Sequence, residues 1–203
     1  MTPQHTLTII IISWNTRSIL AQCLASVYTN APCNGAPLHG APGSAFETFE
    51  TIVVDNGSTD GSPAMVREQF PQARLIENSR NDGFARANNQ AMRVSASRYV
   101  LLLNSDTEIR PGALDSLVRC MALHPQAGAA GAYLLNPDGT LQESCYPTPT
   151  LSRELWRLLH LDALRPYGVY HMADWDANTP REIEAAMGAC LILRRSALDQ
   201  VGL

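Results

Sequence analysis

The sequence predicts an α/β protein in which helices cover a mainly parallel, doubly wound sheet with a small antiparallel part. Apolar, β-branched runs of strand length alternate with segments of helical periodicity up to about residue 125. Two of these runs, Ile52 to Asp55 and Tyr99 to Asp106, stop at an aspartate, and open parallel sheets bind ligands where their strands end. After Gln126 the alternation gives way to short runs typical of antiparallel pairing.

The first part of the chain predicts a strand, a helix and a loop. The run from Leu7 to Trp14 is rich in β-branched residues and favours a buried strand. Asn15 or Thr16 is a candidate cap for the helix that follows. The apolar residues of that helix keep helical spacing, at Ile19, Leu20, Cys23, Leu24 and Val27. Ala31 to Glu47 is rich in Pro, Gly and Ala and predicts a long surface loop.

The next part predicts three strands and three helices in alternation. The strands are expected at Phe49–Asp55, Ala73–Glu77 and Arg98–Leu103. The helices are expected at Ser62–Phe70, Phe84–Ala96 and Pro111–Leu123. Ser62 is the predicted N-cap of the first of these helices, and Pro111 is the predicted start of the third.

The last part predicts a hairpin, a helix, a strand and a second helix. The hairpin pairs 129–135 with 141–145 around the turn Asn136 to Thr140. A helix is expected from Leu151 to Leu164, an irregular stretch to Thr179 and one apolar strand from Ala185 to Leu193. Ser196 is the candidate cap of a final helix.

Composition excludes several classes of function. The 203 residues are 45% hydrophobic and 17% charged, which is typical of a globular chain that forms one domain. A net charge of -4 argues against binding to nucleic acid. Five scattered cysteines without metal-ligand spacing indicate a reducing compartment. The apolar run from Leu7 to Ile12 is too short to span a membrane and lacks signal-peptide flanks, so we expect no transmembrane segment and a cytoplasmic protein.

Common nucleotide and hydrolase motifs are missing from the sequence. No Gly-rich turn is followed by Lys and Ser or Thr, which excludes a P-loop. The first strand ends in Ser13-Trp-Asn15 instead of a Gly-x-Gly-x-x-Gly turn, which argues against the usual NAD site. No Gly-x-Ser-x-Gly elbow supplies a hydrolase nucleophile.

Five segments carry the chemistry that remains. They are Ile12 to Asn15, Val54 to Ser62, Asn81 to Asn89, Leu103 to Glu108 and Gly188 to Arg195. In this order they resemble the inverting family 2 glycosyltransferases, in particular the rhamnosyltransferase-like branch with the nucleotide-diphospho-sugar (GT-A) fold. The resemblance implies a single glycosyltransferase domain over 1–203. Residues 1–125 would form its nucleotide-binding half, and 126–203 would begin an incomplete acceptor-side half.

The resemblance implies that Asp55 recognises the donor base. Its carboxylate would accept a hydrogen bond from the imide N–H of a uracil or thymine, since an ionised carboxylate can only accept. The alternative is a turn residue whose carboxylate bonds the backbone amides of Gly57 and Ser58. Asn56, the next residue, is expected beside the donor.

The resemblance also implies a metal role for Asp106. Its carboxylate would hold Mg²⁺ or Mn²⁺ against the donor diphosphate, and one acid together with phosphate oxygens suffices for such a cation. Asn104 stands where the family often has an acid, so it would bond a ribose hydroxyl without adding charge, and Ser105 lies between the two. The alternative is that Asp106 caps the turn before Pro111.

The remaining expected donor contacts come from two segments. Asn81, Gly83 and Asn88 match the family's segment beside the nucleotide, where Gly83 would permit a close backbone approach. Ser13 and Asn15 would line the base pocket, with a helix cap as the alternative for both.

The implied reaction transfers a sugar from a nucleoside-diphosphate donor to an acceptor hydroxyl with inversion. A dTDP- or UDP-sugar is the expected donor, with dTDP-rhamnose first among them. The expected acceptor is a glycan or lipid-linked glycan of surface polysaccharide synthesis, which leaves open a peripheral association with the inner face of the membrane. No catalytic base is identified, because Asp174 and Asp176 qualify only by residue type. Two alternatives stay open: a nucleotide-sugar-binding fragment without turnover, and a sugar nucleotidyltransferase.

Overall fold

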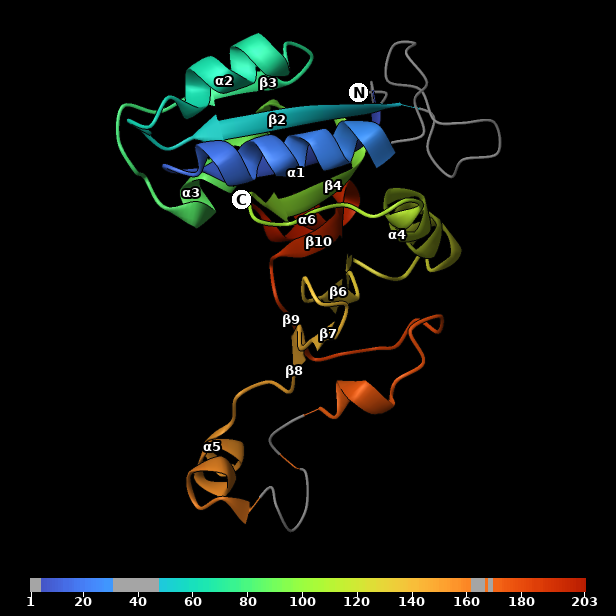
Figure 1. The fold of residues 1–203 in the computed structure, drawn as a ribbon. Helices are drawn as coiled ribbons and strands as arrows, with labels where there is room; N and C mark the ends of the chain where they lie inside the picture. Colours follow the sequence, from blue (N-terminus) through green and yellow to red (C-terminus); the bar gives the residue numbers. More distant parts are fainter. Residues whose placement is uncertain (1–4, 31–47, 162–166, 168–169) are drawn as a thin grey trace. The chain divides into compact units, whose positions relative to one another are not determined.

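The computed structural model describes residues 5–30, 48–161, 167 and 170–203. The chain forms two compact units (Figure 1). The first contains Met1–Ala130 and Gly188–Leu203, and the second contains Gly131–Met187. The predicted loop over 31–47 and the predicted end of the helix at Leu164 lie outside the described residues.

The first unit is built on a six-stranded sheet that confirms the predicted α/β class. Its strands, from edge to edge, are β3 (Arg74–Glu77), β2 (Phe49–Asp55), β1 (His5–Ser13), β4 (Ser97–Asn104), β10 (Cys190–Arg194) and β5 (Ala129–Gly131). The pairs β3–β2, β2–β1 and β1–β4 are parallel, and β10 is antiparallel to β4. The four parallel strands therefore end at the same edge of the sheet.

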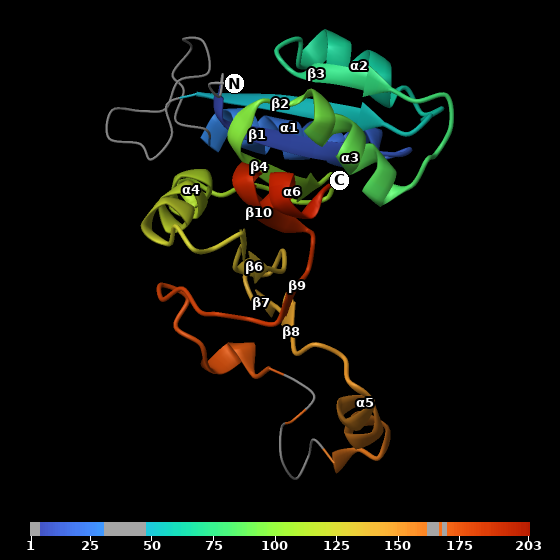
Figure 2. The same ribbon diagram turned by 180° about the vertical axis from the view of Figure 1, so that it is seen from behind.

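Helices cover both faces of this sheet. They are α1 (Arg17–Asn30), α2 (Ser62–Gln69), α3 (Phe84–Val94), α4 (Ala113–Leu123) and α6 (Arg195–Val201). Helix α1 lies on the face seen in Figure 1, and α3 and α6 lie on the face seen in Figure 2. Alternate strand residues such as Ile10, Ile52 and Val100 pack with Ala87 and Ala91 of α3 in a fully buried core.

Arg194, at the end of β10, ties α4 to the sheet. Its guanidinium donates to the carbonyl oxygens of Met121 at 2.6 Å, His124 at 2.9 Å and Ala127 at 2.8 Å, and it stacks over the ring of Tyr99. Carbonyls at a helix C-terminus have no partner within the helix, so a half-buried cation satisfies them and favours the negative end of the helix dipole.

Three predictions at helix starts are wrong: the N-cap of α2, the first residue of α4 and the cap of α6. Helix α2 begins at Ser62, after Gly61 at the N-cap, because the side chain of Asp60 already accepts from both the amide and the hydroxyl of Ser62. Helix α4 begins two residues after Pro111, behind a glycine with φ of 78°. Helix α6 begins before Ser196, which is therefore not its cap.

The second unit contains short strands, and the predicted hairpin is only partly correct. β6 (Leu134–Leu135) pairs with β7 (Leu141–Gln142), whereas 129–131 joins the six-stranded sheet as β5. β8 (Cys145–Tyr146) pairs with β9 (Ala185–Ala186). The predicted strand 185–193 is thus two strands, β9 and β10, because its two ends find partners in different sheets.

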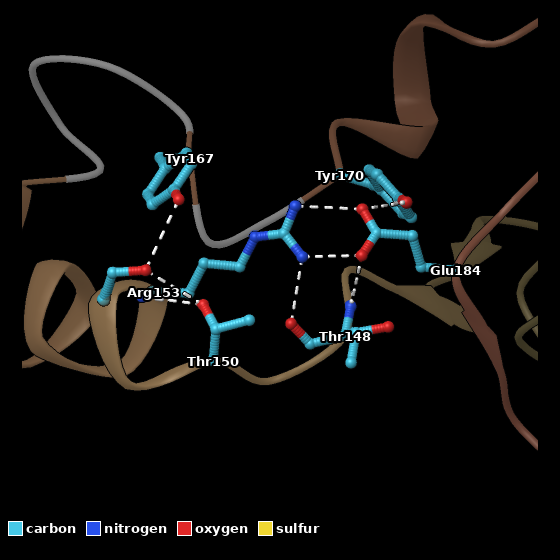
Figure 3. A network of polar contacts seen from close by, with 7 residues as sticks. Thr148, Thr150, Arg153, Tyr167, Tyr170 and Glu184 are labelled. Atoms are coloured by element: carbon cyan, nitrogen blue, oxygen red, sulfur yellow. Dashed lines mark hydrogen bonds and ion pairs between the residues drawn. The ribbon is translucent and has the colours of Figure 1, made fainter.

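Helix α5 (Leu151–Leu158) is held through its polar side. The Arg153 guanidinium forms a two-pronged ion pair with Glu184, at 2.6 and 2.9 Å, and donates to the carbonyl oxygen of Thr148 (Figure 3). The hydroxyl of Tyr170 also donates to Glu184. The hydrogen bonds from Arg153, followed by that from the Thr148 amide, lower the pKa of Glu184 to about 2. We call Arg153, Glu184, Thr148 and Tyr170 the α5 clamp.

Candidate functional site

The ends of β2, β1 and β4 bring the two predicted acids to one edge of the sheet. Asp55 is paired with Ser13 in the β1–β2 register, and Asn104 is paired with Ile12 in the β1–β4 register. Asp106 follows Asn104 in a turn that closes with a bond from the Thr107 amide to the Asn104 carbonyl oxygen at 3.1 Å. Parallel pairing thus aligns three strand ends that are far apart in the sequence.

The carboxylate of Asp55 is divided between two roles. Asp55 is 2% exposed. Its Oδ2 accepts from the amide of Ser58 at 2.8 Å, which is one of the two backbone bonds of the turn alternative. Its Oδ1 is also buried, yet it has no hydrogen-bond partner among the described residues. A buried carboxylate oxygen without a donor is costly, so Oδ1 is the atom here that most favours an incoming N–H group.

Asn15 fastens the loop after β2 to the turn after β1. Its amide donates to Ser58 Oγ at 2.8 Å, and its Oδ1 accepts from the amide of Thr59 at 2.8 Å. The backbone of Asn15 has φ of 54°, a left-handed conformation that Asn tolerates better than most residues. The side chain therefore bonds the neighbouring loop instead of capping α1.

Asp60 is a loop-fixing residue that the sequence analysis missed. Its Oδ2 accepts from the amide of Arg17, the first residue of α1, and its Oδ1 accepts from Ser62, the first residue of α2. Burial acts to raise the pKa of Asp60, but the bonds from Ser62 and Arg17 outweigh it and lower the pKa. One carboxylate thus serves two helix N-termini, and an acid two residues before the expected helix at Ser62 was the signal for one of them.

A cavity of about 280 Å³ lies at this edge of the sheet. Five predicted site residues line it: Asn56, Asn81, Asn104, Ser105 and Asp106. Four further residues complete the lining: Ile12, Trp14, Thr16 and Phe84. The sequence analysis did not single out Trp14 and Phe84, although both lie in the five segments that carry the resemblance. Their side chains are 55% and 50% exposed. Exposed aromatic faces at a polar cavity suit a planar ring such as a base.

A second cavity, of about 490 Å³, lies between α1 and α2. Its lining includes Asn15, Arg17 and Asp60, and it shares Thr16 with the smaller cavity. It contains neither Asp55 nor Asp106, and the groups of Asn15 and Asp60 are already hydrogen-bonded. We therefore assign the candidate site to the smaller cavity, because the unpaired carboxylate of Asp106 lines it.

Five predicted residues do not line the smaller cavity: Ser13, Asn15, Asp55, Gly83 and Asn88. Ser13, Asp55 and Asn88 are buried, at 0%, 2% and 3% exposure. Ser13 Oγ bonds Thr16 Oγ1, and Asn88 Nδ2 donates to the carbonyl oxygen of Phe84 within α3. Asn15 lines only the larger cavity.

Gly83 lies close to the cavity, with φ of 83° and open space where a Cβ would stand. Its carbonyl oxygen accepts from Asn56 Nδ2 at 3.5 Å, and its amide donates to Asn81 Oδ1 at 2.9 Å. The open space at Gly83 leaves room for another molecule, and the close approach expected there stays a prediction.

The side chain of Asp106 is exposed and makes no hydrogen bond or ion pair with any residue that the structure describes. The neighbouring Asn104 and Ser105 add neutral oxygen donors. Such hard oxygen donors fit Mg²⁺ or Mn²⁺. Within the described ranges, no group of three or more His, Cys, Asp or Glu side chains forms a metal cluster. The donor set thus fits a cation whose other ligands come from a phosphate.

The two acids considered as a base lie in the second unit. Asp176 Oδ1 accepts from the amide of Asn178 and its Oδ2 accepts from Thr179 Oγ1. The bond from Thr179, followed by that from Asn178, lowers the pKa of Asp176. A carboxylate with a lowered pKa is a poor proton acceptor. Asp174 lies in the short 3₁₀ turn η2 (Met172–Asp174) and is exposed.

Comparison with solved structures supports the fold. The chain is similar to a mannosyltransferase from Pyrobaculum calidifontis in complex with GDP-Man and Mn²⁺, with a TM-score of 0.62 and 22% identity over 99% of this chain and 48% of that one. It is also similar to Staphylococcus aureus TarS 1–349 in complex with UDP, with a TM-score of 0.58 and 17% identity over 97% of this chain and 48% of that one. At such identities the likeness concerns the fold, which is that of GT-A glycosyltransferases.

Sequence comparison identifies the family. The chain is 28% identical over 170 residues to the N-acetylglucosaminyl-diphospho-decaprenol L-rhamnosyltransferase of Mycobacterium tuberculosis, covering 74% of this chain and 53% of that protein. It is 31% identical over 163 residues to the O-antigen biosynthesis protein RfbC of Myxococcus xanthus, covering 77% and 12%. The chain thus spans about half, or less, of the length of these relatives. The model of "Glycosyl transferase family 2" matches residues 8–202, and the chain therefore belongs to that family.

Proposed function

We propose that the cavity at the strand ends binds a nucleoside-diphosphate sugar, a dTDP- or UDP-sugar, whose sugar is transferred with inversion to a hydroxyl of a glycan or lipid-linked acceptor. One observation carries this proposal: neighbouring strand ends hold a buried Asp55 oxygen without a donor and an exposed Asp106 carboxylate without a cation partner. The first suits a base N–H and the second suits a metal-bound diphosphate. Family membership does not favour the nucleotidyltransferase alternative, because the matched family contains glycosyltransferases.

The division of the Asp55 carboxylate favours uracil or thymine as the base. Oδ2 is already engaged by the Ser58 amide, so Oδ1 is available for one new donor. A uracil or thymine imide presents one N–H, whereas guanine presents two adjacent N–H donors that suit a whole carboxylate. Cytosine presents an acceptor there and would be repelled. Oδ1 is buried in the absence of nucleotide, so neighbouring side chains would move to let the base reach it. Trp14 or Phe84 would then stack on the base.

The metal part of the proposal assigns the cation to Asp106, with Asn104 and Ser105 as oxygen neighbours. Mg²⁺ or Mn²⁺ bound there would act as a Lewis acid that stabilises the departing diphosphate. Among the described residues that line the cavity, Asp106 supplies the only full charge, so the chain alone should hold the cation weakly. Binding of cation and nucleotide should therefore be coupled. The Mn²⁺ in the P. calidifontis mannosyltransferase structure is in keeping with this assignment.

The proposed transfer needs a base for the acceptor hydroxyl, and we propose that none of the described residues supplies it. Asp176 is already hydrogen-bonded by Thr179 and Asn178, and its pKa is lowered. The competing proposal is a domain that binds the nucleotide-sugar without turnover. Release of UDP or dTDP from the corresponding sugar nucleotide, measured with and without an acceptor mixture, distinguishes them, since steady acceptor-dependent release would identify a complete enzyme.

The acceptor side of the proposal includes a peripheral contact with a lipid surface through α5. Leu151, Leu155, Leu158 and Leu159 follow one helical face and are 79%, 50%, 73% and 64% exposed. Arg153 of this helix belongs to the α5 clamp, whereas the leucines face outward and Arg157 is exposed beside them. Arg157 is ion-paired with Glu154 at 2.6 Å, so the exposed leucines, and not a net positive charge, suit this helix to an interface. The decaprenol-linked acceptor in the name of the mycobacterial relative would lie at such a surface. No helix within the described ranges is long and apolar enough to cross a bilayer.

Sedimentation with vesicles of phosphatidylglycerol and phosphatidylcholine tests the lipid contact. The double variant Leu155→Glu, Leu158→Glu should abolish cosedimentation. Leu123→Glu, at an equally exposed leucine of α4, should not. Equal binding of all three proteins, or no binding by the wild type, would contradict the lipid contact.

Calorimetric titration tests the donor site. UDP and dTDP should bind more tightly with Mn²⁺ than with EDTA, and Asp106→Ala should abolish this difference. Glu108→Ala is a matched control, because Glu108 is an exposed acid of the same segment outside the cavity lining. If neither nucleotide binds, or if Asp106→Ala keeps the manganese effect, the proposed site is wrong.

A further inference from the structure

One face of α1 contacts the backbone at both ends of the segment that carries Asp106. Cys23, Ser26 and Asn30 stand three and four residues apart, so they share one side of the helix. Each of their side chains bonds a backbone group of residues 104–109. None of the three lines the candidate cavity, and none was singled out as a functional residue from the sequence.

The C-terminal end of the segment is held at a single residue, Ile109. Ser26 Oγ accepts from the Ile109 amide at 2.8 Å while its own hydroxyl donates to the Cys23 carbonyl oxygen at 2.7 Å. Asn30 Nδ2 donates to the Ile109 carbonyl oxygen at 2.7 Å and to the Ser26 carbonyl oxygen at 3.1 Å. Ile109 is 5% exposed, so water competes little for these bonds. Both backbone polar groups of Ile109 are thus fixed by two side chains of α1.

The N-terminal end of the segment is held at Asn104. Its carbonyl oxygen accepts from the Thr107 amide and from the Cys23 thiol, whose Sγ lies 3.6 Å away. Its amide donates to the carbonyl oxygen of Ala189 at 2.9 Å. Burial, and then the nearby Asp106 carboxylate, raise the pKa of Cys23 to about 12, so the thiol keeps its proton at neutral pH and can donate.

Residues 105–108 form a short span between these two fixed ends. The side chain of Asp106 has no hydrogen-bond partner of its own among the described residues, so its position depends on the backbone that carries it. Groups that hold a metal-bearing residue in place typically change metal affinity about 10–100-fold when they are removed. The bonds to Ile109 are short contacts from side chains outside the segment, so substitutions can remove them.

We infer that Ser26 and Asn30 are positioning residues for Asp106: by holding Ile109 they keep its carboxylate where a cation bridges it to a nucleoside diphosphate. The inference rests on the proposed metal role of Asp106. It assigns the last turns of α1 to the diphosphate end of the donor site, in addition to their role in the core. A purely structural role for the two residues would lower thermal stability and would weaken nucleotide binding equally with and without metal.

The readout is the ratio of the UDP dissociation constant in EDTA to that in saturating Mn²⁺, measured on the whole chain by calorimetry. Ser26→Ala and Asn30→Ala should reduce this ratio about 10–100-fold, while binding in EDTA stays unchanged. If the wild-type ratio is itself below that range, it should fall to unity. Ser26→Thr keeps the hydroxyl and should restore the ratio. Thr29→Ala is the matched control, because Thr29 is an exposed residue of the same helical turn. Thermal unfolding of each variant separates this effect from loss of the fold.

Hydrogen–deuterium exchange of the peptide covering 105–110, without nucleotide or metal, is a second readout. It should be faster in Ser26→Ala and Asn30→Ala than in Thr29→Ala. A manganese ratio that stays at the wild-type value in both folded alanine variants, while Asp106→Ala abolishes it, would overturn the positioning role and leave the proposed function intact. Unchanged exchange would overturn it as well. A ratio that survives Asp106→Ala would refute the metal role, and the inference would fall with it.

Discussion

Exchange of Asp55 for Asn is the sharpest perturbation of the proposed base pocket. The Asn side-chain oxygen can still accept from the Ser58 amide, so the loop keeps the bond that Oδ2 now makes at 2.8 Å. The atom in place of Oδ1 then becomes an NH₂ group. A donor would thus face the imide N–H of uracil or thymine, where the wild-type chain offers an acceptor. The same NH₂ group would meet a favourable acceptor in cytosine.

The expected magnitude follows from the burial of this carboxylate. Asp55 is 2% exposed, and its Oδ1 has no partner among the described residues, so a base N–H would form a charge-assisted bond shielded from water. Such a bond contributes about 1.5–3 kcal/mol. At about 1.4 kcal/mol per tenfold change, its loss weakens UDP binding by a factor of roughly 10–150. Asp55→Ala should lose as much affinity and also destabilise the loop, because it leaves the Ser58 amide unpaired.

The assay is calorimetric titration of wild type and Asp55→Asn with UDP and with CDP, in saturating Mn²⁺. We expect the variant to lose UDP affinity and to gain CDP affinity, so that the preference for UDP falls by at least about tenfold. Glu68→Gln, at an exposed acid of α2 outside both cavities, controls for the loss of one negative charge. Unchanged UDP affinity in Asp55→Asn, or an equal loss for both nucleotides, would refute the reasoning about Oδ1.

Two further predictions concern stability. Arg194→Ala should lower the free energy of unfolding by about 2–4 kcal/mol in urea titrations, because three half-buried carbonyl oxygens near the end of α4 lose a cationic donor. Arg194→Lys should recover only part of the lost free energy, since an ammonium cannot reach all three carbonyl oxygens. Full recovery would contradict the forked geometry. Glu184 has a pKa lowered from 4.5 to about 2, so its ion pair stabilises fully above about pH 4.5 and is lost as the pH falls toward 2. Tryptophan fluorescence should report loosening of α5 in that pH window. The Glu184→Gln variant should show a loosened α5 already at neutral pH. An identical acid transition in the wild type and in Glu184→Gln would argue against the α5 clamp.

The local pattern of the sequence was sufficient for the first 125 residues because most of their strands are parallel and buried on both faces. Such strands appear as continuous β-branched runs, and the helices between them keep a regular apolar spacing. The observed β1, β2, β3 and β4 lie within about two residues of the predicted ranges at each end. Errors at the helix starts came from side chains that bond backbone groups at those starts, such as Asp60, whose bond to the distant Arg17 amide no local pattern reveals.

The later part was harder because its pairing is non-local. Residues 185–193 look like one apolar strand, but Ala185 and Ala186 pair with β8, whereas Cys190 onward pairs with β4. Likewise, 129–131 was expected in a hairpin and instead lies at the edge of the six-stranded sheet. Apolar composition predicts that a segment is extended, but the partner depends on which sheet edge is available in the folded chain.

The sequence by itself determined the family, the α/β class and the presence of an aspartate at the ends of two strands. Each of these depends on patterns of residues that are neighbours along the chain. Only the tertiary structure decided that Asp55 keeps one oxygen for the loop and one without a donor, and that Trp14 and Phe84 line the same cavity as Asp106. It also decided that α1 holds the Asp106 segment through Ser26 and Asn30. Apart from the local bond between Asp55 and Ser58, these features depend on hydrogen bonds between residues more than 40 positions apart or on side chains brought together from separate segments. Such contacts exist only once the sheet has aligned its strand ends.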